Sequence, residues 1–461
     1  MSTHVDLAVV GGGISGLAAG WEGRRRGADV LVVEAESRPG GKLQTSPLAG
    51  VPLDESADAF LARVPDAVDL CGELGIATDL VAPAPGSAYV WLDGALRRLP
   101  PDQLLGVPTD LDAVADSGLL SPAAVERARR DLTLPDDRPG GDESVGDLVR
   151  RRLGDEVLDR LVAPLVGSIY AGDIDRLSLQ VSAAQLAAAR DHDPTDPSLL
   201  RAAAALRAQA VGTGRPVFLA PRGGMGRLAG ALSDALGDGL RTGCRVDAIT
   251  REGERWRLEP LGVTADAVVV ATPAFVSGPL LAPVAPEAAA LLSSIEHASV
   301  ALVALAVPRQ GIDHPLDASG FLVPRSAGLL LTACSWVTAK WPHLDVDPST
   351  AVLRASVGHD GDERGRTLPG DELLGGLLAD LRTTMGLRAA PTEVRITRWP
   401  RSFPQPRPGH LAAVAAAEAS LADTAPGLTL TGAWARGVGV PACIRSARTA
   451  TAHALSATTG V

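Results

Sequence analysis

Short apolar runs alternate with helical patterns at the start of the chain, as expected for a parallel sheet covered by helices. Residues 5–10 form an apolar run, and the glycine-rich segment 11–16 that follows it can begin a helix. A second apolar run over residues 28–33 ends at Glu34, eighteen residues after Gly16. Continuous apolar runs of this length predict strands that are buried on both faces. The first part of the chain therefore predicts a strand–helix–strand unit of an α/β fold.

Later apolar runs predict further strands of this sheet and a second sheet. Residues 265–273 and 428–432 predict strands that join the first sheet, and the second of them leads into a glycine-rich turn and a helix to about residue 455. The unbroken apolar run at 298–307 predicts a buried strand of a second sheet. Antiparallel strands of that sheet are predicted at 320–325, 332–336, 351–357 and 394–400, together with a β-hairpin with an Asp-Gly turn at 89–100.

The segments between these runs have weaker patterns. Residues 43–60 predict a hairpin-like return whose turn is Ser56–Ala59, and residues 61–80 predict an amphipathic helix. Residues 241–250 predict a strand that returns to the first sheet. Residues 101–212 are rich in Ala, Leu, Arg and Asp and are interrupted by Pro and Gly, which predicts a helical domain inserted into the α/β framework.

The segment after the first strand carries a nucleotide-binding motif. Gly11, Gly13 and Gly16 form G-x-G-x-x-G: the first allows a tight turn, the second lets the backbone approach a pyrophosphate, and the third lets helix and strand pack closely. The helix start then presents N–H groups and a positive dipole end to phosphate. Glu34 is placed for a ribose hydroxyl, and the run Arg38-Pro39-Gly40-Gly41-Lys42 is typical of amine-oxidase-type flavoproteins, which favours FAD. A structural turn without a ligand is the alternative.

These patterns together predict an α/β protein with a Rossmann-like FAD-binding domain, a mixed-sheet substrate domain and an inserted helical domain. The expected ranges are 1–60, 213–273 and 405–461 for the FAD-binding domain, 61–100 and 274–404 for the substrate domain, and 101–212 for the helical domain.

Composition narrows the class of partner. The net charge of −11 argues against nucleic acid, because phosphate binding needs clustered Lys and Arg. The four cysteines are far apart and the histidines are scattered, which argues against disulfides and predicts no metal site. No apolar run reaches the roughly 20 residues of a membrane span. Because the first strand begins almost at once, we expect no signal peptide and a cytoplasmic protein.

Several further motifs give the chain a resemblance to the porphyrinogen oxidases, FAD enzymes that aromatise protoporphyrinogen or coproporphyrinogen in haem synthesis. The resemblance covers most of the chain and is weakest over 101–145. Its specific pieces are Gly167–Asp173, Gly320–Arg325, Trp336–Pro342, Arg398–Pro400, Pro404-Gln405 and Gly409-His410. Amine-oxidase relatives share the FAD turns but not this set, and their flavin-proximal Lys on the long central strand has no counterpart at 298–307.

The resemblance implies a set of contacts to non-covalent FAD. They are Gly11, Gly12, Gly13, Ile14, Ser15, Gly16, Glu34, Ala35, Lys42, Ser56, Ala57, Asp58, Ala59, Val246, Trp399, Val438, Gly439, Val440, Pro441, Ala442 and Cys443. For Val246 an ordinary buried strand position is the alternative, for Trp399 a place in the interdomain core, and for Cys443 packing is expected rather than flavin attachment. The chain departs from the family at Ser56–Ala59, where Gly-Pro-x-Ser is usual, and at Pro406, where Tyr is usual.

The sequence nominates few residues for the substrate. Arg97 and Arg98 at the exit of the 89–100 hairpin could grip substrate carboxylates, or could simply be a solvated hairpin end. Tyr170 lies between two glycines where helices are expected to cross, near the substrate cavity. No Ser–His–Asp set or carboxylate pair stands out, so the catalytic base is left unassigned.

The resemblance implies three successive two-electron oxidations of a cyclic tetrapyrrole, each passing hydride from a meso carbon to the flavin, with O2 reduced to H2O2. The polar, proline-broken insert lacks an apolar docking helix, which favours the four-carboxylate coproporphyrinogen III as substrate. Protoporphyrinogen IX is the alternative substrate. Two different functions would also use the cofactor motifs: an FAD amine oxidase or carotenoid desaturase, and a non-catalytic flavin- or porphyrin-binding protein. The oligomeric state is left open.

Overall fold

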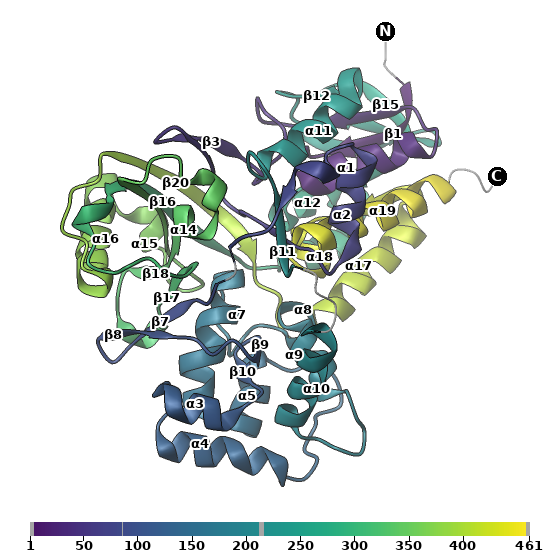
Figure 1. Cartoon of the computed structure of the whole chain (residues 1–461). Coiled ribbons are helices and arrows are strands. Elements are labelled where there is room, and N and C mark those ends of the chain that lie inside the picture. The colour runs from purple at the N-terminus through teal and green to yellow at the C-terminus, as the bar shows by residue number, and fades with distance from the viewer. Residues whose placement is uncertain (1–3, 85, 212–215, 458–461) are drawn as a thin grey trace.

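The described residues form two seven-stranded sheets with helices on their faces, three smaller sheets of two or three strands, and a separate group of helices beneath the large sheets (Figure 1). The computed structural model describes residues 4–84, 86–211 and 216–457. The α/β class and the presence of a helical group agree with the sequence-based expectation. The predicted boundary at 212/213 lies outside the described residues.

The first sheet is built around the strand predicted at the start of the chain. β1 lies between β2 and β15 and is parallel to both, whereas β14 and β13 extend the sheet in antiparallel register. The order is β12 (Leu240–Arg241), β2 (Val30–Val33), β1 (His4–Val10), β15 (Val263–Val270), β14 (Arg255–Glu259) and β13 (Ala248–Glu252), with β21 (Leu428–Leu430) parallel to β15.

Helices cover both faces of this sheet because its strands are apolar on both sides. Leu7 and Val9 point to one face, and Ala8 and Val10 to the other. The first face packs against α1 (Ile14–Arg25), α2 (Pro65–Glu73), α11 (Gly226–Leu236) and α19 (Val440–Ser456). The second packs against α12 (Ala274–Leu281), α13 (Pro286–Ser293) and α17 (His410–Thr424).

Three helices from the ranges expected for the substrate domain share their cores with the first sheet. α2, α12 and α13 lie in the ranges expected for the substrate domain, yet their buried residues belong to the cores on the two faces of the first sheet, where α2 packs on α19 and α13 packs on α12 and α17. Sequence pattern gives the apolar face of a helix but not the surface that covers it.

The second sheet is mixed. Its strands are antiparallel neighbours except for β17 and β7, which are parallel. The order is β20 (Glu393–Pro404), β16 (His297–Pro308), β19 (Thr350–Val357), β18 (Leu331–Trp336), β17 (Gly320–Leu322), β7 (Tyr89–Leu92) and β8 (Ala95–Arg98). The hairpin predicted at 89–100 thus forms the edge, and α16 (Gly370–Met385) covers the sheet with Leu373, Leu377 and Leu381.

The insert is a helical unit with its own core, as its composition predicts. Its elements are β9 (Gln103–Leu104), β10 (Val107–Pro108), α3 (Leu111–Ser117), α4 (Pro122–Arg129), α5 (Val145–Leu153), α6 (Asp155–Val157), a π-helical turn (Leu158–Val162), α7 (Ala163–Tyr170), α8 (Leu179–Ser182), α9 (Ala184–Arg190) and α10 (Leu199–Val211).

Two local predictions were wrong. The hairpin in 43–60 is β3 (Thr45–Leu48) and β4 (Val51–Asp54), which turns at Ala49-Gly50, where both residues have positive φ. Ser56–Ala59 instead lies in the connection from β4 to the short strand β5 (Phe60–Leu61), and this connecting segment is the Ser56–Ala59 turn referred to below. The strand expected over 241–250 is interrupted between β12 and β13, so Val246 lies in irregular backbone.

Further short elements complete the fold. They are β6 (Leu80–Val81), β11 (Phe218–Pro221), α14 (Val337–Lys340), α15 (Arg364–Thr367), α18 (Ala433–Arg436) and 3-10 turns at Ala77–Asp79, Arg130–Leu132, Gly237–Gly239, Arg309–Gly311, Arg325–Ala327 and Pro342–Leu344.

A buried ion pair organises the helical insert. The Asp131 carboxylate accepts from Arg152 Nε at 2.6 Å, from Ser198 Oγ at 2.8 Å and from the Leu200 N–H at 2.9 Å, and both charged side chains are almost fully buried. It thereby joins the turn after α4 to α5 and to the start of α10.

We expect Asp131→Ala to lower the free energy of unfolding by about 3 kcal/mol, because it removes the buried counter-ion of Arg152 and leaves only the more exposed Asp137 carboxylate at 3.4 Å. Urea unfolding followed by circular dichroism measures this. Asp112→Ala, which breaks the exposed pair with Arg129, is the control and should change stability little. Equal effects of the two substitutions would contradict the assignment.

Candidate functional site

A cavity of about 3300 Å³ lies between the first sheet, the second sheet and the helical insert. Pockets for a single small ligand are typically about 300–1,000 Å³. This cavity is therefore large enough for an extended dinucleotide and a second large molecule.

The carboxyl end of β1 forms one end of the cavity. Gly13 precedes α1 and lines the cavity, and a Cβ added there would enter open space among the described residues. Gly16 lies behind the wall, where an added Cβ would be 1.7 Å from the Gly11 carbonyl oxygen. The motif thus brings the α1 N-terminus, which has positive electrostatic potential, to the cavity surface.

Glu34 stands beside this turn at the end of β2. Its carboxylate accepts from the Gly12 N–H at 2.6 Å and from the Glu36 N–H at 2.8 Å, and Glu34 and Ala35 both line the cavity. The carboxylate therefore holds the glycine turn in place and still presents acceptor oxygen to the cavity. Val246 lines the same end, although from irregular backbone rather than a strand.

A second helix N-terminus reaches the cavity from the end of the chain. The segment Val438–Cys443 lines the cavity and leads into α19, whose N-cap is Gly439. Burial raises the pKa of the Cys443 thiol, and the hydrogen bond with Ser15 only partly offsets this effect. The thiol is therefore protonated at neutral pH.

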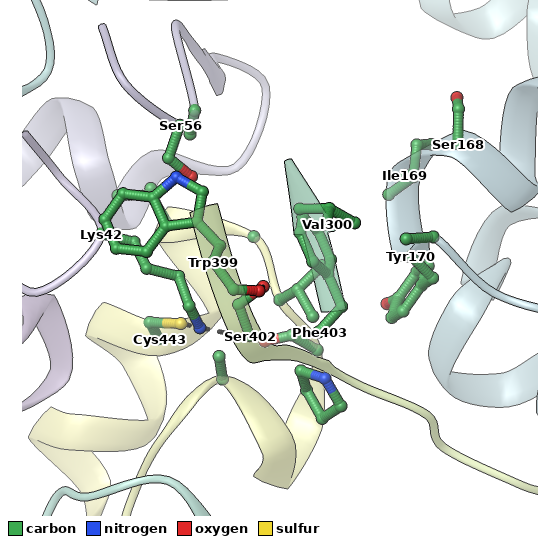
Figure 2. Close-up of a pocket in the computed structure, with 18 of the residues that line it drawn as sticks. Lys42, Ser56, Ser168, Ile169, Tyr170, Val300, Trp399, Ser402, Phe403 and Cys443 are labelled. Atoms are coloured by element: carbon green, nitrogen blue, oxygen red, sulfur yellow. Dashed lines mark hydrogen bonds between the residues drawn. The ribbon is translucent and has the colours of Figure 1, made fainter. Parts of the chain in front are cut away.

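Trp399 and the Ser56–Ala59 turn line the middle of the cavity. The Trp399 Nε1–H donates to the Glu55 carbonyl oxygen at 2.7 Å, which ties β20 to the residue before the turn. Figure 2 shows Trp399, Lys42 and Cys443 on one side of the cavity and Tyr170 on the other, with Val300 between them. Burial lowers the pKa of the half-buried Lys42 ammonium.

Tyr170 lies at the end of α7, where the insert meets the cavity. Its hydroxyl donates to the Val181 carbonyl at 2.9 Å, and its own carbonyl accepts from Gln405 Nε2 at 2.9 Å. Burial raises the pKa of Tyr170 to about 12, so the phenol stays neutral. Gln405 thus fixes the position of an aromatic wall residue.

The structure corrects the placement of Arg97 and Arg98. Both lie outside the cavity lining among the described residues. Arg98 is exposed and pairs with Asp317 at 2.5 Å, with the Tyr89 hydroxyl also in contact. For Arg98 this is the solvated hairpin end that the sequence left open, whereas Arg97 is half-buried and its Nε is shielded from solvent.

The sequence patterns missed three cavity residues. Lys340 and Arg354 come from α14 and β19 and form ion pairs with Asp58. His297, at the start of β16, has a neutral imidazole because burial lowers its pKa to about 4. Arg354 sits inside an otherwise apolar strand, and this break in the apolar pattern was the available signal.

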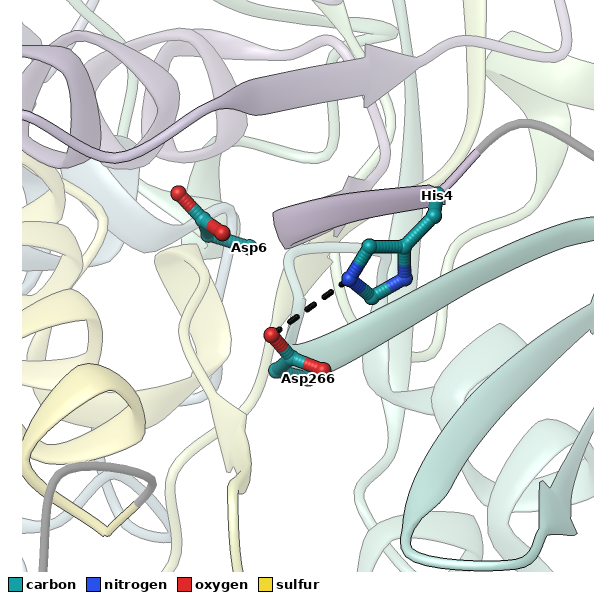
Figure 3. Close-up of side chains that lie close together, drawn as sticks. All are labelled: His4, Asp6 and Asp266. Atoms are coloured by element: carbon teal, nitrogen blue, oxygen red, sulfur yellow. Dashed lines mark ion pairs between the residues drawn. The ribbon is translucent and has the colours of Figure 1, made fainter.

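A small polar cluster lies at the other end of β1. Ligand atoms of His4, Asp6 and Asp266 come within 4.8 Å of one another, and His4 Nε2 is 3.5 Å from the Asp266 carboxylate (Figure 3). Asp6 accepts from the Asp29 N–H at 2.8 Å. His4 and Asp6 are exposed and Asp266 is half-buried. The ion pair and the backbone hydrogen bond already engage these side chains, and we assign no metal to them.

The glycine turn after β1 and the α1 N-terminus at the cavity are the arrangement of a dinucleotide-binding fold. Residues 14–455 match the model of the family described as flavin containing amine oxidoreductase, and the chain belongs to this family. Within the described residues, every helix is too short or too polar to cross a membrane.

Relatives in this family that match along most of the chain carry two names, coproporphyrinogen III oxidase and protoporphyrinogen oxidase. The chain is 32% identical to coproporphyrinogen III oxidase of Bacillus subtilis over 467 residues, covering 98% of each chain. It is 34% identical over 473 residues to the protein of the same name from Mycobacterium tuberculosis H37Rv, covering 99% of this chain and 98% of the relative. Protoporphyrinogen oxidase 1 of Spinacia oleracea is 28% identical, covering 96% of this chain and 83% of the relative.

Solved structures confirm the architecture. A crystal structure from Exiguobacterium sp. 255-15 superimposes with a TM-score of 0.85 at 30% identity, covering 98% of both chains. Cyclohexylamine oxidase from Brevibacterium oxydans superimposes with a TM-score of 0.68 at 20% identity, covering 98% of this chain and 99% of that one, and shows the shared fold.

His297 gives a prediction for the dependence of stability on pH. Its folded pKa of about 4 lies below the ordinary value of 6.5, so the unfolded chain binds more protons and stability falls as pH drops through this window. We expect His297→Asn to reduce the loss between pH 7 and pH 5 by roughly 1–2 kcal/mol. Urea unfolding at both values measures it, and an unchanged loss in the variant would contradict the assignment.

Proposed function

We propose that this protein is an FAD-dependent coproporphyrinogen III oxidase, which converts coproporphyrinogen III and three O2 to coproporphyrin III and three H2O2. The observation that carries the proposal is similarity along the whole chain to several proteins of that name, at 29–35% identity. We also propose that it works in the cytoplasm in haem synthesis.

The residues around the cavity are compatible with FAD. Two helix N-termini, at Gly13 and Gly439, open into the same cavity, and open space lies where a Cβ at Gly13 would project. Gly13, Ile14 and Ser15 would hold the pyrophosphate and Glu34 the adenosine ribose. The turn Ser56–Ala59, Trp399 and Val438–Cys443 would surround the ring, bound without a covalent link.

The remaining cavity volume would hold the tetrapyrrole between Trp399 and the insert. When bound, the flavin supplies two-electron oxidation and returns the electrons to O2. Tyr170, held by Gln405, and Val300 form an apolar wall that orients the macrocycle and excludes water. Because aromatisation drives the reaction, positioning is the principal task of the protein.

Turnover of the two porphyrinogens tests the proposal. Purified protein reconstituted with FAD should oxidise coproporphyrinogen III under air, with growth of porphyrin absorbance and release of about three H2O2 per porphyrin. A clear preference for protoporphyrinogen IX would select the alternative substrate. Ammonia release from amines would indicate an amine oxidase, and flavin that stays oxidised on anaerobic mixing with either porphyrinogen would indicate a binding protein.

Gly13→Ala tests the cofactor site without disturbing the fold. The backbone at Gly13 (φ −71°) accepts Ala, and the added methyl group would project into the space assigned to phosphate. We expect at least a tenfold weaker affinity for FAD, about 1.4 kcal/mol, with unchanged thermal unfolding of the apoprotein. Gly230→Ala is the matched control, because Gly230 is an exposed position of α11 outside the cavity lining and its added Cβ also enters open space. Undiminished FAD binding by the Gly13 variant would argue against this cofactor site.

A further inference from the structure

The lysines of this chain lie in one part of the molecule, the wall of the cavity. Of the 43 basic residues in the chain only two, Lys42 and Lys340, are lysines, and both line the cavity. Elsewhere the chain uses arginine as its cation. Both lysine ammonium groups of the chain are thus in the cavity wall.

Lys340 belongs to a buried cluster centred on Asp58. One carboxylate oxygen of Asp58, Oδ2, lies 2.8 Å from Lys340 Nζ and 3.2 Å from Arg354 Nη2, and the Trp341 Nε1–H is 3.4 Å away. The exposed fractions of the three charged side chains are 12–18%. Burial alone would raise the pKa of Asp58, but Lys340 and Arg354 outweigh it and hold the pKa below its ordinary value. The cluster therefore places one carboxylate between two basic side chains in the cavity wall.

The same cluster holds the Ser56–Ala59 turn from behind. Arg354 Nη1 donates to the Ser56 carbonyl at 2.7 Å and to the Asp54 carbonyl at 3.1 Å. Asp58 itself lies within the turn, and Lys340 and Arg354 come from the second sheet and its adjoining helix. These bonds fix the turn between the two sheets and place the charges directly behind it.

We propose that Asp58, Lys340 and Arg354 are positioning residues that set the redox potential of the flavin through their charge. The inference rests on the proposed function, in which the turn faces FAD. Reduction adds negative charge to the ring, so the two cations favour reduced flavin and the Asp58 carboxylate opposes them. In a partly buried site these interactions are screened less than in water.

Single substitutions should therefore shift the potential in opposite directions. Lys340→Met removes a cation and should lower the flavin potential, whereas Asp58→Asn removes the anion and should raise it. We expect each to change the ratio of oxidised to reduced flavin about tenfold at a fixed solution potential, which is ~30 mV for a two-electron couple. Lys340→Arg keeps the charge and should restore the wild-type potential.

The measurement is anaerobic reduction of the FAD-loaded protein beside a reference dye, followed by the visible spectrum. At pH 8 the nearby Asp54, whose pKa is raised to about 6 by burial, is ionised. Asp345→Asn, which breaks a pair with Arg309 outside the cavity, is the control and should leave the potential unchanged.

The outcomes separate this inference from the proposed function. Wild-type protein that takes up no FAD would overturn the proposed function. Suppose that the wild-type protein holds FAD, but Lys340→Met and Asp58→Asn shift the flavin potential in the same direction or leave it unchanged. The cluster would then be purely structural, and the inference would be overturned. If Asp58→Asn loses FAD, the two Lys340 variants decide. A lower flavin potential in Lys340→Met, together with the wild-type potential in Lys340→Arg, supports the inference. Any other result for that pair, including loss of FAD from Lys340→Arg, overturns it.

Discussion

The close packing of α1 against the end of β1 is the constraint on which the rest of the site depends. Gly16 lies so near the Gly11 carbonyl that any side chain would push the helix away from the sheet. With glycine there, the N-terminus of α1 opens at the edge of the sheet, and its N–H groups and dipole face the cavity. Glu34 then braces the turn through the Gly12 N–H. The position of this helix N-terminus at the cavity follows from the backbone contact between Gly16 and Gly11.

Around that fixed point the cavity wall comes from distant parts of the chain. β15 and β21 extend the parallel sheet beside β1, so the end of the chain returns α19 to the same edge. The long strands β16 and β20 carry the second sheet up to the cavity, where Trp399 bonds to the backbone before the 56–59 turn. The insert closes the remaining side through Tyr170, which Gln405 holds. Each wall is tied to another by a specific hydrogen bond, so the cavity has a defined shape before anything binds.

The departures from the family pattern are local and are compensated in this chain. Ser56-Ala57-Asp58-Ala59 replaces a glycine-proline turn, yet Arg354 and Lys340 hold this turn through Asp58 and the Ser56 carbonyl. Pro406 stands where Tyr is usual, and its carbonyl accepts from the Ser178 N–H at 2.8 Å, which keeps the segment against the insert.

The sequence by itself determined the strand–glycine–helix turn, the second glycine turn before α19 and the long buried strand at β16. These features depend on local geometry and on apolar runs, both of which are written in consecutive residues. Tertiary structure alone decided which core α2, α12 and α13 join, that Arg98 pairs with Asp317 outside the cavity, and that Asp58 meets Lys340 and Arg354. Asp58 is separated from those partners by about 300 positions. Contacts over such separations depend on how whole sheets pack, and no periodicity along the chain encodes them.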